Sequence, residues 1–547
     1  MSFQYNSVRN QRSQLIQSIC VGGVVAFSSP TFAINVDTGV QDLRVRFDNT
    51  IKYSAAFRLN DQDEDVIAAY NPNLDDGDYN FDKGLISNRL DLLSEFDLVY
   101  QNRYGFRLSG AAWYDTVYND ENDNPGFQGG AVPNNQSVPF DEFTDDTRRV
   151  HGRNAEVLDA FVFGRTYLGE TELSARLGRH SLLWGESLFF GSNGIAGAQA
   201  PVDFVKLLSI PNSQFKEVIR PVNQFSTELT LTPTISVGAF YQFEWEENRV
   251  PAVGSYLSRN DLLDEGGELF YLPAAFGGPV PRGDDQDASD SGQFGVQFRW
   301  FSESINTDFG LYAVRFHDKN PIVYVRPGQD YRLTYAEDID VFGLSASHTF
   351  GSFNVAGEVS VRRDTPLVPA GGAVFDFVGD ANNTDNPLYP IGNTAHAQIS
   401  TIHSLSRNDF WDGGLLLAEI AWNRVTSATE NGQFVDPNAD RDAVAFRMLF
   451  EPTLYQVTSG VDMGIPIGLG YTNGRSSAIQ LFNGGFHNGG DMSLGLSFDI
   501  QQKYRAGITY THYYGEAGGI LDESGSYSFK QSFKDRDYIS LSIQTTL

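Results

Sequence analysis

The chain has 547 residues, of which 69 are acidic and 39 basic, and its formal net charge is −30. A protein this acidic lacks the basic patches that nucleic-acid binding needs, so we predict no nucleic-acid partner. The only cysteine, Cys20, lies in the N-terminal segment described next, which excludes disulfides and thiol catalysis for the rest of the chain.

Residues 1–33 have the features of an export signal. Arg9 and Arg12 precede a mostly apolar stretch, and a small-x-small cleavage site ends at Ala33. The apolar stretch is too short to span a bilayer, and no run of about eighteen apolar residues follows it. We therefore predict a signal peptide over 1–33 and a single domain over 34–547, without a transmembrane helix.

Apolar and polar residues alternate with period two along most of the chain, as in strands with one polar and one apolar face. The first such run extends from Leu43 to Leu59, a length typical of a tilted membrane strand. Short turns and long, often acidic loops alternate strictly between the runs. The predicted strands are 43–59, 85–100, 104–118, 153–168, 171–181, 223–232, 234–246, 291–302, 306–317, 337–350, 352–364, 393–405, 412–426, 440–452, 460–471, 490–501, 503–515 and 536–547.

This pattern predicts an all-β protein, a transmembrane antiparallel outer-membrane β-barrel of about 18 strands (16–18). Its short turns and both termini would be periplasmic, and its long loops would face outward from a Gram-negative cell. The alternating C-terminal face is similar to the signal read by the barrel-assembly machinery, although Leu547 replaces the usual phenylalanine. We expect that machinery, outer-membrane lipid and lipopolysaccharide as partners.

The alternation stops between Gly178 and Gln224. Clustered apolar residues lead into a bend at 191–194, and two helical turns are predicted over 201–210 and 212–220, with Pro201 at a first helical position. A segment this apolar is not expected to extend into water. We predict that about 182–222 folds into the barrel as a constriction or plug.

Charged side chains on the predicted inward faces, and residues of the infolded segment, are the candidate lumen residues. Arginine binds carboxylates and phosphates in a bidentate way, so the wall would guide an anionic or amphipathic acid. The alternative is that acidic neighbours, such as Glu95 and Glu419, pair with these arginines and brace the wall. The candidates are Arg44, Arg46, Lys52, Arg107, Arg176, Trp184, Glu186, Phe189, Phe190, Asp203, Phe204, Arg220, Arg299, Glu358 and Arg362.

A family resemblance rests mainly on Gly178-Arg179-His180-x-x-x-Trp184-Gly185-Glu186, with further matching stretches at 155–162, 201–203 and 217–222. In these, the chain resembles a proteobacterial outer-membrane β-barrel family of unknown function. Its genes often neighbour an RND/MMPL-type inner-membrane exporter and a LolB-like periplasmic protein. The resemblance implies handling of a hydrophobic or lipid-like molecule, with that exporter and a periplasmic lipid carrier as partners.

Neither an enzyme nor a metal or cofactor site is predicted. His180 and Ser181 are adjacent and point to opposite faces of a strand, and no G-x-S-x-G motif occurs. The stretch 436–442 begins like a calcium loop, but Arg441 stands where the loop needs glycine.

The leading functional hypothesis is passage or export of a hydrophobic or amphipathic small molecule, including anionic ones. A general or substrate-specific aqueous porin is the first alternative, in which the infolded segment narrows a water-filled pore. A structural or adhesive barrel, working through its acidic outer loops, is the second. The substrate and the direction of transport are left open by the sequence.

Overall fold

The computed structural model describes residues 34–36, 38–67, 71–126, 133–211, 213, 215–263 and 265–547. The predicted signal peptide, residues 1–33, lies outside the described residues. Among those described, no helix is both long and apolar enough to cross a bilayer.

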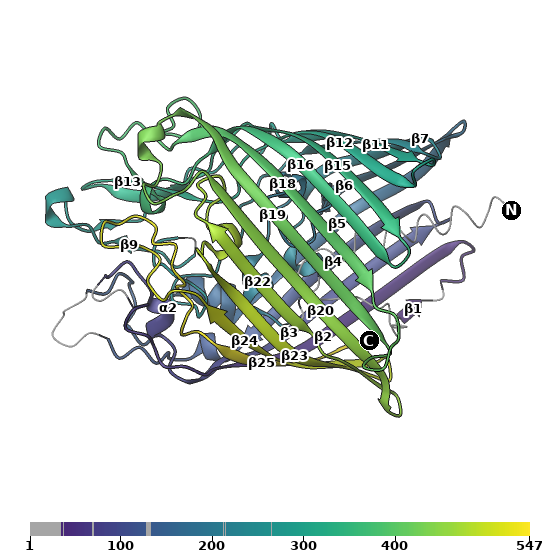
Figure 1. The fold of residues 1–547 in the computed structure, drawn as a ribbon, viewed down its shortest axis with the longest axis horizontal. Helices are drawn as coiled ribbons and strands as arrows, with labels where there is room; N and C mark the ends of the chain where they lie inside the picture. Colours follow the sequence, from purple (N-terminus) through teal and green to yellow (C-terminus); the bar gives the residue numbers. More distant parts are fainter. Residues whose placement is uncertain are drawn as a thin grey trace.

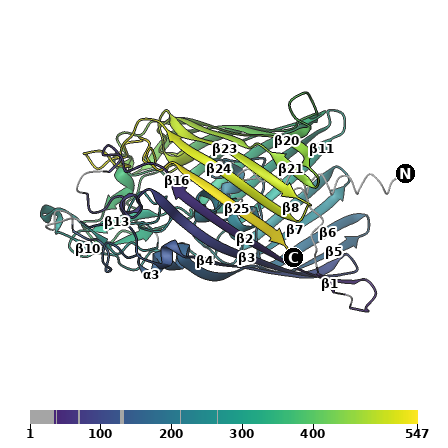
Figure 2. The same cartoon turned by 90° about the horizontal axis from the view of Figure 1, so that it is seen from below.

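Eighteen antiparallel strands in the described chain form a closed barrel, and they run obliquely around it (Figures 1 and 2). The last strand pairs with the first, Thr50 opposite Thr546, which closes the sheet. The strands are β2 (Leu43–Arg58), β3 (Gly84–Tyr100), β4 (Tyr104–Asp115), β5 (Arg153–Leu168), β6 (Thr171–His180), β7 (Val222–Thr232), β8 (Ile235–Gln242), β11 (Phe294–Ser302), β12 (Thr307–Phe316), β15 (Ile339–Phe350), β16 (Phe353–Pro366), β18 (Ile391–Ser404), β19 (Gly413–Glu430), β20 (Asp442–Thr458), β21 (Val461–Gly464) continued by β22 (Ile467–Gly474), β23 (Gly489–Ile500), β24 (Tyr504–Tyr514) and β25 (Tyr538–Thr546). Short β1 (Ile34–Val36) pairs with the start of β2.

The two faces of the wall differ as the period-two pattern predicts. Outward side chains are apolar and exposed, for example Leu311 at 49%, Leu494 at 55% and Ile399 at 60%. Alternate residues point inward and are polar: Gln398 and Ser400, which flank Ile399, are buried. A closed barrel with an apolar outer belt is the architecture of outer-membrane proteins, because lipid offers no partner for exposed backbone groups.

Short turns lie at one end of the barrel and long loops at the other, as predicted. The C-terminus and β1 lie at the turn end (Figure 1). The predicted end of the strand at Pro452 is wrong, because β20 continues to Thr458. Pro452 stands opposite the interruption between β21 and β22 at Pro466, so both missing N–H groups fall at one irregularity of the sheet.

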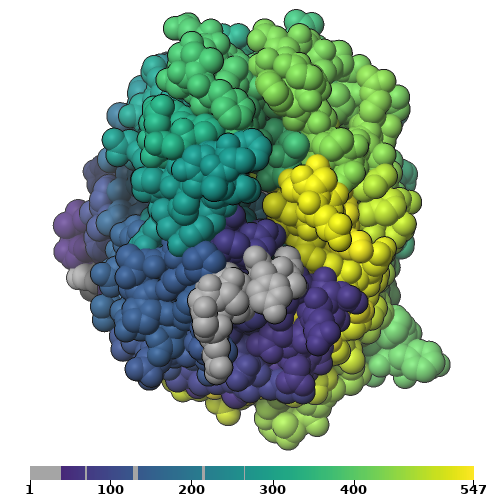
Figure 3. Space-filling view, turned by 90° about the vertical axis from the view of Figure 1, so that its left-hand side faces the viewer, coloured from purple at the N-terminus to yellow at the C-terminus, as the bar shows by residue number. Residues whose placement is uncertain are grey.

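The long loops carry structure that the sequence pattern did not reveal. β13 (Ile322–Arg326) pairs with β14 (Asp330–Thr334) and, in parallel, with β17 (Ala373–Phe375), while β9 (Leu269–Phe270) pairs with β10 (Val280–Pro281). The buried core of these strands includes Val325 and Leu333. Figure 3 shows this end of the barrel, where purple, blue, teal and yellow segments meet over the mouth.

Helices in the described residues are short. Those outside the infolded segment are α2 (Asp76–Tyr79), α3 (Asp145–Thr147), the π-helix η3 (Arg148–Gly152) and the 3-10 turns η1 (Val117–Asn119), η5 (Ala274–Phe276), η6 (Ala370–Gly372), η7 (Gly432–Phe434) and η8 (Phe482–Gly484). Within that segment lie η4 (Ile195–Ala198), α4 (Phe204–Ser209) and α5 (Phe215–Val218).

Candidate functional site

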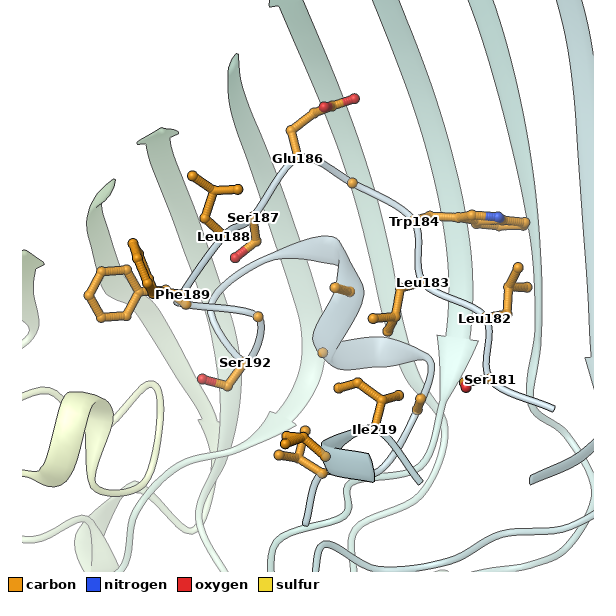
Figure 4. Close-up of a pocket in the computed structure, with 18 of the residues that line it drawn as sticks. Ser181, Leu182, Leu183, Trp184, Glu186, Ser187, Leu188, Phe189, Ser192 and Ile219 are labelled. Atoms are coloured by element: carbon orange, nitrogen blue, oxygen red, sulfur yellow. The ribbon is translucent and has the colours of Figure 1, made fainter. Parts of the chain in front are cut away.

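A cavity of about 2500 Å³ lies inside the barrel. Its lining begins at residues of the short turns, such as Asn102 and Glu303, and reaches the long loops at Leu263 and Phe533. The segment between β6 and β7, residues 181–221, is here called the insert. Its described residues lie inside the barrel beside this space (Figure 4). The cavity therefore follows the lumen past the insert.

The insert leaves and rejoins the wall at neighbouring positions, since His180 and Val222 are paired in register. Its two arms hold each other: the N–H of Asp203 donates to the carbonyl of Val218 at 2.7 Å. The Asp203 carboxylate then caps α4 by accepting from the N–H of Lys206 at 2.8 Å. The predicted helical start at Pro201 is wrong, because α4 begins at Phe204 after this cap.

Two buried glutamates of the wall hold the backbone of the insert. Glu358 on β16 accepts from the N–H groups of Glu186 at 2.7 Å and Ile195 at 2.9 Å. Glu419 on β19 accepts from three successive N–H groups, those of residues 188–190. The insert has no strand partner there, so these carboxylates satisfy backbone groups that would otherwise be buried unpaired.

The bend at 191–194 is held by the same side of the wall. Arg362 on β16 donates to the carbonyls of Ser192 at 2.7 Å and Gly194 at 3.0 Å. Asn193 donates to Gln398 at 3.2 Å and accepts from Asn423 at 3.2 Å. The insert supplies both donors and acceptors to this contact, which gives it one defined position against β16, β18 and β19.

The apolar residues of the insert divide between the wall and the cavity. Trp184 packs against Phe240, with ring centroids 5.1 Å apart, and Phe190 against Phe482 at 5.6 Å. These two candidates anchor the insert to the wall and loops. Phe189 and Phe204 are half-buried and line the cavity. Leu183 lies near Ile219 (Figure 4), and the two belong to one apolar cluster of the insert.

Ion pairs fix the base of the insert. Asp203 pairs with Arg249 at 2.8 Å, and Arg249 also pairs with Glu156 on β5 at 2.7 Å. Lys206 reaches the same Glu156 at 2.7 Å. Candidate Arg220 pairs with Glu246 at 2.7 Å and does not line the cavity. The insert is therefore tied to both sides of the barrel.

Half of the candidate arginines of the wall, Arg46, Arg107 and Arg299, are paired with acids. Arg107 contacts Glu95, Asp97 and Asp159. Arg299 pairs with Glu186 of the insert at 3.2 Å.

The remaining candidates lie elsewhere on the wall. Arg46 pairs with Asp48 at 2.5 Å, and Arg44 reaches Asn102 at the turn end. Lys52 is buried in the wall, and Arg176 lies over the ring of Phe161 at 5.8 Å. Ten basic and ten acidic side chains line the cavity. Wall pairing, the alternative interpretation, describes Arg46, Arg107 and Arg299 but not Arg44, Arg176 or Arg362 among the described contacts.

Several contributing residues were not among the candidates. Gln398 and Asn423 occupy inward positions of predicted strands. Their place in the apolar-polar alternation is the only sequence feature that indicates an inward side chain. Lys319 lines the cavity from a long loop, where periodicity carries no information. Glu156 on β5 and Arg249 in the loop after β8 are 93 residues apart and pair directly in the folded barrel.

The ring nitrogens of His180, the histidine considered above for catalysis, lie close to two residues other than Ser181. His180 Nε2 lies 2.8 Å from Ser226 Oγ on β7, and its Nδ1 lies 2.9 Å from the carbonyl of Gly178. Within the part of the chain that the structure describes, no group of three or more His, Cys, Asp or Glu side chains is suited to a metal ion.

Comparisons with known proteins place the whole barrel in one family. The model of a family described as a protein of unknown function (DUF1302) matches residues 14–547. A search of curated proteins found no match.

Solved structures show similarity over most of the chain. OpdK of Pseudomonas aeruginosa, solved with vanillate, has a TM-score of 0.41 and 10% identity, covering 92% of this chain and 98% of that one. OccAB3 of Acinetobacter baumannii has a TM-score of 0.42 and 9% identity, covering 92% and 99%. The outer-membrane channel DcaP of Acinetobacter baumannii has a TM-score of 0.37 and 9% identity, covering 92% and 97%.

Proposed function

The chain belongs to the DUF1302 family, whose description assigns no function, and we propose from the lumen itself that it is an outer-membrane channel. It passes a small hydrophobic or amphipathic molecule through a barrel that the insert narrows. The observation that carries this proposal is the cavity of about 2500 Å³, which runs from the turn end to the loops beside a firmly held insert.

The surface of the insert supports an apolar or amphipathic substrate. Leu182, Leu183 and Leu207 are only half-buried and line the cavity, and Leu208 is 42% exposed within it. Apolar side chains facing a lumen are unfavourable in water unless something apolar covers them at least part of the time. A substrate with an apolar part would cover this patch as it passes.

A water-filled porin is the second candidate, and the composition of the cavity lining favours it. The lining carries ten acidic and ten basic side chains together with many serines and threonines. Such a surface is well hydrated. In this case the insert would set a size limit for polar solutes, and the leucine patch would only pack the insert.

Single-channel recording of the refolded barrel in a planar bilayer tests the proposal. We expect a small, steady current that an apolar or amphipathic solute reduces on addition to either side. A large current that such solutes leave unchanged would favour the porin. A folded barrel without any current would contradict both channel hypotheses and leave the structural or adhesive barrel.

The proposal implies an orientation of the barrel in the outer membrane and a set of partners. We place the turn end, with the termini, in the periplasm and the long loops outside, since outer-membrane barrels carry short periplasmic turns. Assembly by the barrel-assembly machinery, contact with lipopolysaccharide, and supply by an RND/MMPL-type exporter or a periplasmic lipid carrier stay predictions.

A further inference from the structure

Two buried cations line the cavity on the loop side of the insert without an ion pair. Lys319, in the loop after β12, is 4% exposed, and Arg362, on β16, is 7% exposed. In the described part of the chain, neither lies within 4.0 Å of a carboxylate oxygen, whereas Arg299 and Arg447, which also line the cavity, both do. Burying a cation without a counter-charge is unfavourable, so this arrangement calls for an explanation.

The protein occupies only some of the hydrogen-bond donors of Lys319 and Arg362. Lys319 Nζ donates to the carbonyl of His317 at 3.3 Å and lies 5.2 Å from the ring centroid of Phe316, although an ammonium has three donors. Arg362 uses Nη2 for two carbonyls of the insert, while its buried Nε has no hydrogen-bond partner. Donor capacity is therefore left over beside the cavity.

The nearby carboxylates are engaged elsewhere. Asp318 accepts from its neighbours in the loop, including the N–H of Lys319 at 2.7 Å and that of Asn320 at 3.0 Å. Glu358, four residues before Arg362 on the same strand face, holds the insert backbone. Both groups offset the positive charge, but neither occupies the donors of the two cations.

The charged state of Lys319 suits an anion at neutral pH. Burial lowers the pKa of its ammonium to about 8, with Asp318 opposing the shift and Arg362 adding to it. The group is therefore mostly protonated at pH 7. An anion between the two cations would relieve their mutual repulsion as well as their burial.

Apolar side chains adjoin the two cations in the same cavity. Ile322 follows Lys319 by three residues, and half-buried Pro366 follows Arg362 by four, and both line the cavity. We propose that this loop-side chamber binds an amphipathic monocarboxylate, with its carboxylate between Lys319 and Arg362 and its apolar part against Ile322 and Pro366. The inference rests on the proposed channel function and specifies its substrate class.

Hexanoate is the probe for the test, and hexanamide, of the same length but uncharged, is its matched control. Titration calorimetry of the refolded, detergent-solubilised barrel measures binding of each probe to the parent and to Lys319→Met. We expect hexanoate to bind saturably and hexanamide about tenfold more weakly, because one charge-assisted contact is worth about that much. Lys319→Met should weaken hexanoate about tenfold and leave hexanamide unchanged.

Two further variants keep the test decisive. Lys530→Met removes the same charge from a lysine paired with Glu516 in a loop, away from the cavity lining, and should leave hexanoate binding unchanged. Lys319→Arg keeps the charge and should retain binding within about threefold. Equal binding of hexanoate and hexanamide, or equal losses in Lys319→Met and Lys530→Met, would overturn the inference.

Current recordings on the same preparation separate this inference from the channel proposal. A barrel that conducts but does not bind hexanoate keeps the channel function and loses the carboxylate site. A barrel that binds hexanoate with the predicted dependence on Lys319 but never conducts keeps the site and loses the channel.

Discussion

The most informative single residues are the two wall glutamates that hold the insert, Glu358 and Glu419. Glu419 accepts from the N–H of Phe190 at 3.0 Å, from that of Leu188 at 3.1 Å, and from that of the residue between them. Hydrogen bonds to a charged acceptor are stronger than neutral ones, so charge matters at this position as well as shape.

Glu419→Gln is expected to loosen the insert without unfolding the barrel. The amide keeps one acceptor oxygen but loses the charge, weakening contacts worth about 1.5–3 kcal/mol each when charged. We expect noisier single-channel current and faster proteolysis within residues 186–195. Glu451→Gln is the matched control, since Glu451, on the neighbouring strand β20, bonds Ser497 at 2.9 Å and not the insert. Equal effects of the two substitutions would contradict the role given to Glu419.

Among the elements, the insert is the one that distinguishes this barrel from an open pore. It is tied to β16 and β19 by glutamates and to β5 by the ion pairs of Lys206 and Arg249 with Glu156. These attachments hold the insert against both sides of the barrel. Because His180 and Val222 are paired in register, a short turn can replace the whole element.

Replacing residues 182–220 with a short Gly-Ser turn should raise single-channel conductance about twofold or more, since barrels of this strand number otherwise leave an aqueous channel. The measurement is the conductance of the folded barrel in a planar bilayer. Replacing the turn over 405–412, which does not line the cavity, should leave conductance as in the parent. An unchanged current after loss of the insert would show that the constriction lies elsewhere.

At the scale of the whole molecule, the long loops close over one end of the barrel around buried charges. Arg536 is 0% exposed, pairs with Asp75, and donates to the carbonyl of Tyr256 at 2.6 Å. Arg58, at the end of β2, pairs with Asp78 at 2.7 Å. The loops after β2, β8 and β24 are thereby joined in one cap.

The cap should be more stable at acidic than at alkaline pH. Burial raises the pKa of Asp76 and that of Asp535 from 3.8 to about 7. Between pH 3.8 and pH 7 the folded cap binds more protons than the unfolded loops. The stabilisation of the cap by these two carboxyl groups is therefore greatest at about pH 4 and decreases as the pH rises towards 7. We expect proteolysis of the loops, normalised to the denatured chain, to be about tenfold slower at pH 5 than at pH 8.

Asp76→Asn provides the control for this pH dependence. The amide cannot ionise, yet its oxygen can still accept from Gln136, which donates to Asp76 at 2.7 Å. The variant should therefore be cleaved more slowly than the parent at pH 8 and equally at pH 5. Faster cleavage at pH 5 than at pH 8 in the parent would contradict the proposed linkage.

The barrel itself could be predicted because its information is local. A strand between lipid and lumen alternates residue by residue, so runs such as that from Leu43 reveal both the strand and its facing. The position of the insert could also be predicted, because the alternation stops after Gly178. The local pattern predicts the ends of strands less accurately. β8 ends at Gln242, before the predicted end at 246, because Trp245 turns into the core of the loops, with its ring 4.6 Å from that of Tyr335.

The sequence by itself thus determined the barrel class, the strand order and the position of the insert. Tertiary structure alone decided which lumen residues meet, because these partners lie far apart in the chain: Glu186 and Glu358 are 172 residues apart. Only the closed barrel brought Glu358 and Glu419 to the insert and turned Trp184 to the wall. It also left Lys319 and Arg362 without an ion pair to any residue that the structure describes. Pairing of charges across a lumen depends on distance in space, which period-two alternation does not encode.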